Sequence, residues 1–194
     1  KPITEKDWRH AVIAIPGKLT SAFLALKLFV YESLPQLPPE DHFPVFPFDE
    51  ILPAVKEGKV DAGVIIHEGQ LTFAKENLMC AVDLGQWWQE QTSLPLPLGV
   101  NVVRNDLPQE IQQEILRCLK ESIRLAQENH SEALSYALQF GRGISREQAE
   151  RFVKMYVNDW TLNMGEKGVL AIQTFLQKGA QAGFVPETHL RVVT

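Results

Sequence analysis

The sequence predicts an α/β fold whose first part is a right-handed parallel β-α-β-α-β unit. Three short apolar runs rich in β-branched and aromatic residues are typical of buried strands, and they lie at 11–15, 45–48 and 61–66. Segments with helical patterning separate each run from the next. Strands that alternate with helices pair in parallel, because the helix carries the chain back across the sheet, almost always with a right-handed turn.

Caps and turns set the boundaries inside this unit. Gly17 turns the chain out of the first strand, and Thr20 or Ser21 then caps a helix. Proline interrupts the second apolar run, which we expect at a sheet edge because proline cannot donate to a strand ladder. Asp49 is expected to cap a short helix that Gly58 closes. The predicted elements are a strand at 11–15, a helix with apolar residues between 23 and 29, a proline-rich loop at 33–44, an edge strand at 45–48, a helix at 50–57 and a strand at 61–66.

The later part of the chain is dominated by helical patterning. The segment 94–99 reads LPLPLG, and a stiff extended segment of this kind suits a hinge between two compact parts. We therefore expect an α/β lobe with hinge strands at 8–104 and a helix-rich part at 105–194. The predicted elements are an irregular helix at 69–77, a strand at 78–84, a helix at 85–90, a strand at 100–104, and helices at 108–129, 131–140 (capped by Ser131), 145–158 (with a Ser145 and Gln148 capping motif) and 168–179.

Two residue pairs are expected to be buried for structural reasons. Trp87 and Trp88 favour packing in the core and at the lobe surface over a stacking platform. Cys80 and Cys118 lie among apolar residues without CxxC spacing, so we expect buried free thiols. This use of cysteine is typical of a reducing environment and predicts a cytoplasmic location.

Charge and composition limit the classes of partner. The net charge is −5 and the pI is about 5.6, which argues against nucleic acid as the main partner. A small anionic ligand stays possible, because local dipoles rather than net charge determine what a pocket binds. No apolar stretch is long enough to cross a bilayer, so no membrane partner is expected. The sequence starts at Lys1 and soon enters a core strand, so we expect it to be part of a longer protein.

The predicted strand at 61–66 ends at a titratable pair, His67 and Glu68. Ligands of open α/β sheets bind beyond the carboxyl ends of the strands. A histidine at this position can exchange a proton near neutral pH. The residues alone leave two interpretations open, a general base and a structural histidine whose ring is satisfied by its neighbours.

A second feature lies at the carboxyl end of the first strand. A strand, the Gly17 turn and a helix that starts at Thr20 or Ser21 form a typical anion cradle, because free amides and the helix dipole favour negative charge. The same hydroxyls can equally be plain helix caps. Since parallel strands end at one edge of the sheet, this turn and His67 are expected to converge on one cleft.

Other site chemistries find little support in the sequence. His67 has no second histidine at helical spacing, and the cysteines are not arranged as metal ligands, so no metal is expected. The GxSxG, GxGxxG and P-loop patterns are absent. We therefore expect no cofactor, and a cleft that binds a small oxygenated anion or removes a proton from it.

Several motifs stand out along the chain, and the most specific feature is the combination of the His-Glu pair at a strand end with the double tryptophan. The motifs are PGKLTSA at 16–22, ILPAV at 51–55, DAGVIIHE at 61–68, DLGQWW at 83–88, LPLPLG at 94–99 with Asn101 and Arg104, and YVN at 156–158 with Thr161 and Gly165. Together they resemble the 1,4-dihydroxy-6-naphthoate synthases of the futalosine route to menaquinone. Chorismate dehydratase, the sister enzyme of the same pathway, shares the fold of this family but lacks a histidine at this strand end.

The resemblance implies a type II periplasmic-binding-protein-like fold, with two lobes joined by a hinge, used as a cytoplasmic enzyme. It implies a carbon-carbon lyase that converts cyclic dehypoxanthinyl futalosine to 1,4-dihydroxy-6-naphthoate without a cofactor or metal. The resemblance implies that His67 is the general base. Beside it, we expect Glu68 to be a structural ion-pair or loop partner rather than a second catalyst. The expected substrate-binding residues are Gly17, Thr20, Ser21, Asn101 and Arg104, of which Arg104 could equally form a salt bridge between the lobes.

The chain departs from the family pattern in one respect. It lacks an N-terminal stretch similar to Ser-Pro-Cys-Pro-Asn-Asp-Thr-Phe, so one lobe is expected to be incomplete. Either a missing N-terminal segment or a second chain completes the cleft, or the chain is a degenerate relative. Activity of these residues alone is doubtful on this basis. Two alternatives remain open: a non-catalytic solute-binding protein for a small carboxylate, and chorismate dehydratase.

Overall fold

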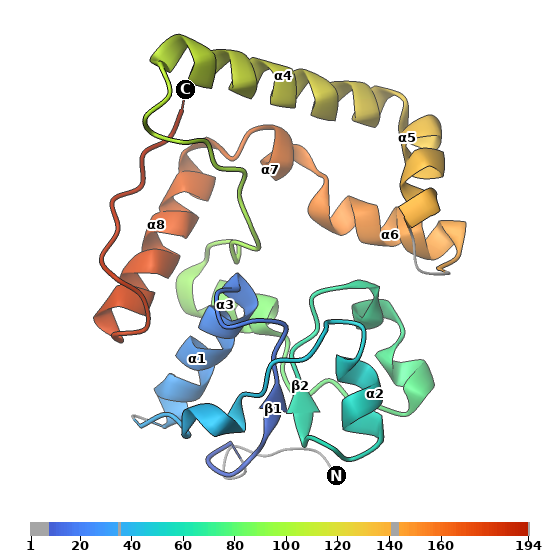
Figure 1. The fold of residues 1–194 in the computed structure, drawn as a ribbon, viewed down its shortest axis with the longest axis vertical. Coiled ribbons are helices and arrows are strands. Elements are labelled where there is room, and N and C mark those ends of the chain that lie inside the picture. Colours follow the sequence, from blue (N-terminus) through green and yellow to red (C-terminus); the bar gives the residue numbers. More distant parts are fainter. Residues whose placement is uncertain (1–7, 35, 141–143, 194) are drawn as a thin grey trace. The chain divides into compact units, whose positions relative to one another are not determined.

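A computed structural model describes residues 8–34, 36–140 and 144–193. The chain divides into two compact units, one made of residues 1–99 and 171–188 and the other of residues 100–170 and 189–194. Over the described residues the chain is mostly helical and contains a two-stranded parallel sheet (Figure 1). No helix among these residues combines the length and the apolar character that a bilayer crossing requires.

The sheet of the first unit contains β1 (Ile13–Ala14) and β2 (Ala62–Gly63), which run in parallel with Ile13 opposite Ala62. On its other side β1 is bridged in parallel through Ile15 to Val45. The three predicted apolar runs therefore lie side by side with the first run in the middle, and the edge position of the second run is confirmed. Both strands are shorter than predicted, although the Val64 amide still donates to the Ala14 carbonyl oxygen over 2.9 Å.

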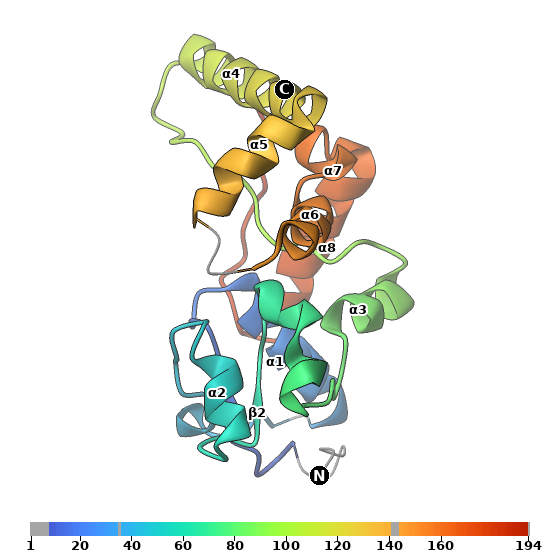
Figure 2. The same cartoon turned by 90° about the vertical axis from the view of Figure 1, so that its right-hand side faces the viewer.

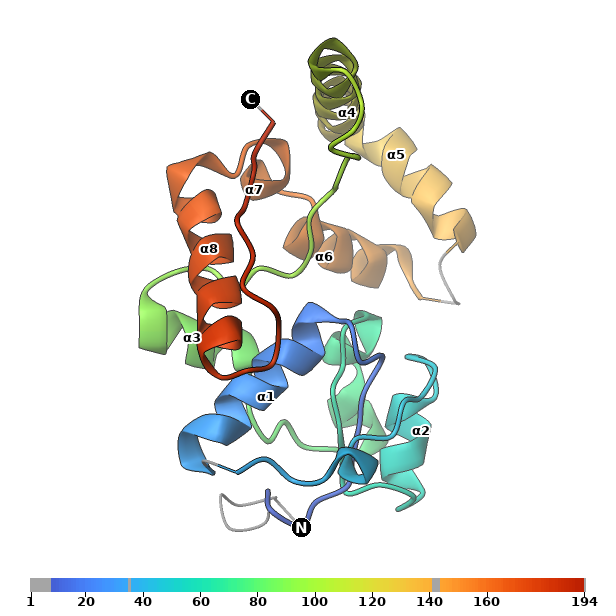
Figure 3. The ribbon, with the colours of Figure 1, turned by 60° about the vertical axis from the view of Figure 1, so that its left-hand side comes forward.

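The first helix of this unit, α1 (Ser21–Ser33), is apolar on two faces and is buried between two layers. One face packs with the sheet residues Ile13 and Ile15. The other face packs against Trp88 and Phe175, whose rings meet edge to face at 5.2 Å. Trp88 is fully buried, which confirms its predicted place in the core. Figure 3 shows α1 next to α3 and the C-terminal part of α8.

The second helix, α2 (Ile51–Lys56), covers the opposite face of the sheet. Neighbouring residues of a strand point to opposite faces, so Ala14 packs against this helix while its neighbours pack against α1. A Cβ atom at Gly63 would lie 2.2 Å from Ile51 Cγ2, and this close approach requires glycine. The prediction that Asp49 caps this helix is wrong. A turn that the Glu50 amide closes onto Pro47 precedes the helix, and Glu50 becomes the N-cap without a side-chain hydrogen bond.

The segment after His67 contains only short helices and coil before α3. The irregular helix predicted at 69–77 is confirmed as two 3₁₀ turns. The strand predicted at 78–84 is wrong: residues 78–83 form no strand, and Met79 is 72% exposed because no neighbouring strand covers it. The remaining elements of this unit are η1 (Glu40–His42), η2 (Glu68–Leu71), η3 (Phe73–Glu76) and α3 (Leu84–Thr92), the last capped by Asp83.

The second unit consists of helices, most of which follow the predicted spacing. The capping box of Ser145 and Gln148 is confirmed at the start of α6. Ser131 is not a cap: α5 follows α4 almost directly and turns away from its end (Figure 2), so Asn129 is the N-cap. The elements are α4 (Gln109–Glu128), α5 (His130–Ala137), η4 (Leu138–Phe140), α6 (Arg146–Tyr156), α7 (Asp159–Leu162) and the start of α8 (Gly165–Gln181).

Strand pairing is missing from the second unit where the sequence predicts it. Residues 100–104 are extended but form no strand among the described residues, and Val102 is 87% exposed. Apolar residues of α4 are also open to solvent, with Ile111 48% and Ile115 42% exposed. In the described residues 100–140 and 144–170 the buried apolar side chains are Leu134 and Ala149.

The thiols are free, as predicted, but the predicted burial of Cys80 and Cys118 is wrong, because both are exposed. Cys80 lies in the coil where the expected strand is absent. Cys118 lies on α4, next to the ion pair of Glu114 and Arg117.

Candidate functional site

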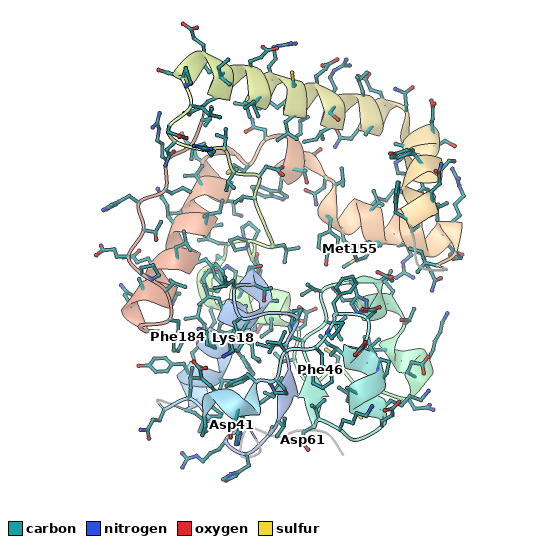
Figure 4. All side chains as sticks on the ribbon, in the orientation of Figure 1. Lys18, Asp41, Phe46, Asp61, Met155 and Phe184 are labelled. Carbon is teal, nitrogen blue, oxygen red and sulfur yellow. The ribbon has the colours of Figure 1, made fainter. Side chains whose placement is uncertain are left out.

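The candidate site lies at the carboxyl edge of the sheet in the first unit. β1 leads into the turn at 16–20, and β2 leads to His67. Because the two strands are parallel, both loops leave the sheet at the same edge. Figure 4 shows Lys18 beyond the carboxyl end of β1 and Asp61 beside the amino end of β2, at the opposite edge.

Thr20 is the N-cap of α1, so the plain-cap interpretation is correct for its hydroxyl. Thr20 Oγ1 accepts a hydrogen bond from the Phe23 amide over 3.2 Å and donates one to the Gly17 carbonyl oxygen over 2.8 Å. The amides of Ser21 and Ala22, in the first turn, have no acceptor within the helix. What this turn offers an anion is therefore backbone amides and the helix dipole rather than the threonine side chain.

Ser21 and Gly17 contribute to this turn in different ways. The Ser21 hydroxyl donates to the Leu98 carbonyl oxygen over 2.5 Å, which fastens the helix start to the proline-rich segment 94–99. A Cβ atom at Gly17 would meet Thr20 Cγ2 at 3.4 Å, an ordinary contact. The turn therefore does not require glycine for steric reasons, and a binding role for Gly17 would come from its backbone.

Lys18 brings a positive charge to the same turn, and sequence reasoning did not single it out. Its ammonium group lies 2.8 Å from Glu40 Oε2. The hydrogen bond from Lys18 lowers the pKa of Glu40 below its ordinary value. Both side chains are exposed, so this ion pair is weak and an anionic ligand can compete for Lys18.

His67 is held in place by backbone groups on both sides of its ring. Nε2 lies 2.7 Å from the Phe48 carbonyl oxygen, and Nδ1 accepts a hydrogen bond from the Gly69 amide over 2.8 Å. A carbonyl oxygen can only accept, so this network assigns the proton to Nε2 and the lone pair to Nδ1. The side chain is 13% exposed. His67 is thus nearly buried, and both of its nitrogens are hydrogen-bonded in the ligand-free site.

Glu68 lies close to the unprotonated nitrogen of this ring. Its Oε2 is 3.9 Å from His67 Nδ1, which is too far for a hydrogen bond but close enough for electrostatic attraction to an imidazolium. This distance fits the expected role of Glu68 as an ion-pair partner.

Asn101 and Arg104 belong to the second unit, apart from the unit that contains His67. Arg104 Nε donates to Asp106 Oδ1 over 2.9 Å, and this hydrogen bond raises the pKa of Arg104 and lowers that of Asp106. Arg104 therefore has an ion-pair partner two residues along the chain. Asn101 is exposed. The binding roles of both residues stay predictions.

Two groups that orient His67 escaped sequence reasoning. The Phe48 carbonyl oxygen and the Gly69 amide are backbone groups, which no side-chain motif reveals. The sequence did contain one indication of such a contact, namely the glycine that directly follows the His-Glu pair. Among residues 8–34, 36–140 and 144–193, no group of three or more His, Cys, Asp or Glu side chains is arranged to hold a metal ion.

Comparison with known proteins defines the family. Residues 1–181 match the family described as menaquinone biosynthesis, and the chain belongs to this family. A 1,4-dihydroxy-6-naphthoate synthase of Streptomyces coelicolor is 32% identical over 94% of this chain and 64% of its own length. A 1,4-dihydroxy-6-naphthoate synthase of Thermus thermophilus is 34% identical over 88% of this chain and 60% of its own length.

A solved structure is also similar to this chain. The crystal structure of a protein from Archaeoglobus fulgidus matches with a TM-score of 0.84 and 44% sequence identity, over 92% of this chain and 65% of that protein. The chain therefore spans less than two thirds of the length of each of these relatives.

Proposed function

We propose that this chain is the part of a 1,4-dihydroxy-6-naphthoate synthase that carries the general base. The reaction would be the carbon-carbon bond cleavage that converts cyclic dehypoxanthinyl futalosine to 1,4-dihydroxy-6-naphthoate in the cytoplasm. The observation that carries this proposal is His67 at the carboxyl end of β2, in a chain of the menaquinone biosynthesis family. The names of the two bacterial relatives support it.

The proposed roles follow from the chemistry of the two loops. His67 takes a proton from the sugar-derived part of the substrate. The first-turn amides of α1, in the turn of Gly17, Thr20 and Ser21, hold an anionic end of the substrate, and Lys18 adds a positive charge beside them. These steps need a base and hydrogen-bond donors from the protein, and we propose that no metal or cofactor takes part.

We also propose that the whole fold is type II periplasmic-binding-protein-like and that further polypeptide completes the second lobe. The relatives are longer than this chain. The extended segment 100–104 has no strand partner among the described residues, and Ile111 and Ile115 of α4 are exposed. Strands from an additional segment would pair with residues 100–104 and would cover Ile111 and Ile115. Asn101 and Arg104 would then contribute to the completed cleft.

The proposed activity is tested with the longest natural form of the protein and the cyclic futalosine intermediate, with product formation followed by mass spectrometry. We expect His67→Ala to lower kcat at least about 100-fold, the usual minimum for loss of a general base. His189→Ala is the matched control, because His189 is an exposed histidine of the other unit. Unchanged turnover in His67→Ala would remove this residue from the mechanism.

One observation favours a second candidate, a binding protein for a small carboxylate. Both ring nitrogens of His67 are hydrogen-bonded to the backbone, as in a structural histidine. This candidate predicts that the cyclic intermediate, or another aromatic carboxylate, binds without conversion. Calorimetric binding with no product in the turnover assay would support it over the enzyme.

A further inference from the structure

We propose that Gly69 is a positioning residue for His67, which it holds in the tautomer with an unprotonated Nδ1, and that Nδ1 is the atom that accepts the substrate proton. This inference rests on the proposed function, since it assigns a positioning residue and a reacting atom to the same base. It starts from two independent contacts of the ring, which select the same tautomer.

The first contact fixes the proton on Nε2. Nε2 lies 2.7 Å from the Phe48 carbonyl oxygen, which has no proton to donate. The second contact fixes the lone pair on Nδ1, because the Gly69 amide can only donate and lies 2.8 Å away. The opposite tautomer would break both hydrogen bonds and would point an N–H at the N–H of Gly69.

Steric contact explains why residue 69 is glycine. A Cβ atom at Gly69 would lie 2.5 Å from His67 Cε1 and 3.0 Å from His67 Nδ1. The same Cβ would also lie 2.8 Å from Leu52 Cδ1, so it would clash with two side chains at once. Gly69 has an ordinary negative-φ backbone, so the requirement comes from the ring and not from the local conformation. Any larger residue must displace the imidazole from its present place.

The direction of proton transfer follows from this arrangement. When Nδ1 takes a proton from the substrate, the Nε2–H bond to the Phe48 carbonyl oxygen persists and strengthens, because the donor is now charged. Glu68 Oε2, 3.9 Å from Nδ1, is positioned to stabilise the imidazolium. The Gly69 amide must release Nδ1 before the proton arrives, so the turn at 67–69 has to open when substrate binds.

The tautomer is tested directly in the protein with ¹⁵N-labelled histidine, without any need for turnover. The ¹⁵N resonances of neutral His67 are assigned by their loss in His67→Ala. We expect a protonated Nε2 and an unprotonated Nδ1 in the parent protein, and a mixture of tautomers in Gly69→Ala. A protonated Nδ1 in the parent would overturn the proposal, even if Gly69→Ala failed to fold.

Kinetics test whether the positioning matters for the reaction. We expect Gly69→Ala to lower kcat about 10- to 100-fold with little change in KM, because misplacement of a base by about 1 Å is enough for such a loss. His189→Ala is again the control, since this exposed histidine has no proposed role in the site, and it should leave kcat and the tautomer of His67 unchanged. Unchanged kcat in Gly69→Ala would overturn the positioning role. That result would leave the proposed function standing, because the proposed function is tested by the turnover of His67→Ala.

Discussion

At the scale of single residues, the clearest result is that a side chain chosen for its chemistry can be fully occupied by local structure. The Thr20 hydroxyl both donates and accepts within its own turn, and the Ser21 hydroxyl donates to Leu98. His67 shows the same behaviour at the other loop. The sequence correctly located both loops but could not show this occupancy, because the partners are backbone atoms that any sequence supplies.

The capping role of Thr20 leads to a stability prediction. Thr20→Ala leaves the Phe23 amide without its acceptor, and we expect the first unit to lose about 1 kcal/mol of unfolding free energy. Thr20→Ser keeps the oxygen and should recover most of this loss. The measurement is urea unfolding followed by tryptophan fluorescence, to which Trp88, buried against α1, contributes. An unfolding midpoint that is the same in Thr20→Ala as in the parent would contradict the capping role.

At the scale of single elements, several charged side chains of α4 have ion-pair partners, whereas several of its apolar side chains are open to solvent. Arg117 Nε donates to Glu114 Oε2 over 2.9 Å, and Arg124 pairs with both Glu121 and Glu128. Pairs at this spacing lie on one face of a helix and support its formation. Helical spacing therefore predicted α4 well, because its hydrogen bonds and ion pairs lie within the element itself.

The ion pair of Glu114 predicts a change in helix content at low pH. The hydrogen bond from Arg117 lowers the pKa of Glu114 from 4.5 to about 2. Because the folded pKa is lowered, the contribution of this pair to α4 is complete above about pH 4.5 and is lost as the pH falls toward 2. We expect Glu114→Gln to reduce the drop in circular dichroism at 222 nm across this range.

Salt provides the control for the Glu114 prediction. The pair is exposed, so 1 M salt, with a Debye length of about 3 Å, should shrink the difference between Glu114→Gln and the parent. Equal acid titration curves for the two proteins at low salt would show that the pair does not support the helix.

At the scale of the whole molecule, helices were predicted better than strands, for a physical reason. A helix satisfies its backbone within the segment, whereas a strand needs a partner from elsewhere. The runs at 11–15, 45–48 and 61–66 find one another and form the predicted parallel arrangement. The runs at 78–84 and 100–104 have strand-like composition but meet no strand partner in the described residues. Residues 78–83 and 100–104 are therefore coil, and Leu84 begins α3.

The two units also differ in how many apolar residues they bury, and this difference predicts that they differ in stability. Among the described residues, the first unit contains three clusters of buried apolar residues, whereas the buried apolar side chains of 100–140 and 144–170 are Leu134 and Ala149. Amide protection follows such burial. We therefore expect hydrogen exchange, measured by mass spectrometry on the 194-residue chain, to be at least about tenfold faster in α4, α5 and α6 than in α1 and β1.

If further polypeptide completes the second lobe, exchange in these helices should slow selectively in the longer natural protein. Equal protection of α4 and α1 in the 194-residue chain would show that the second unit is already complete.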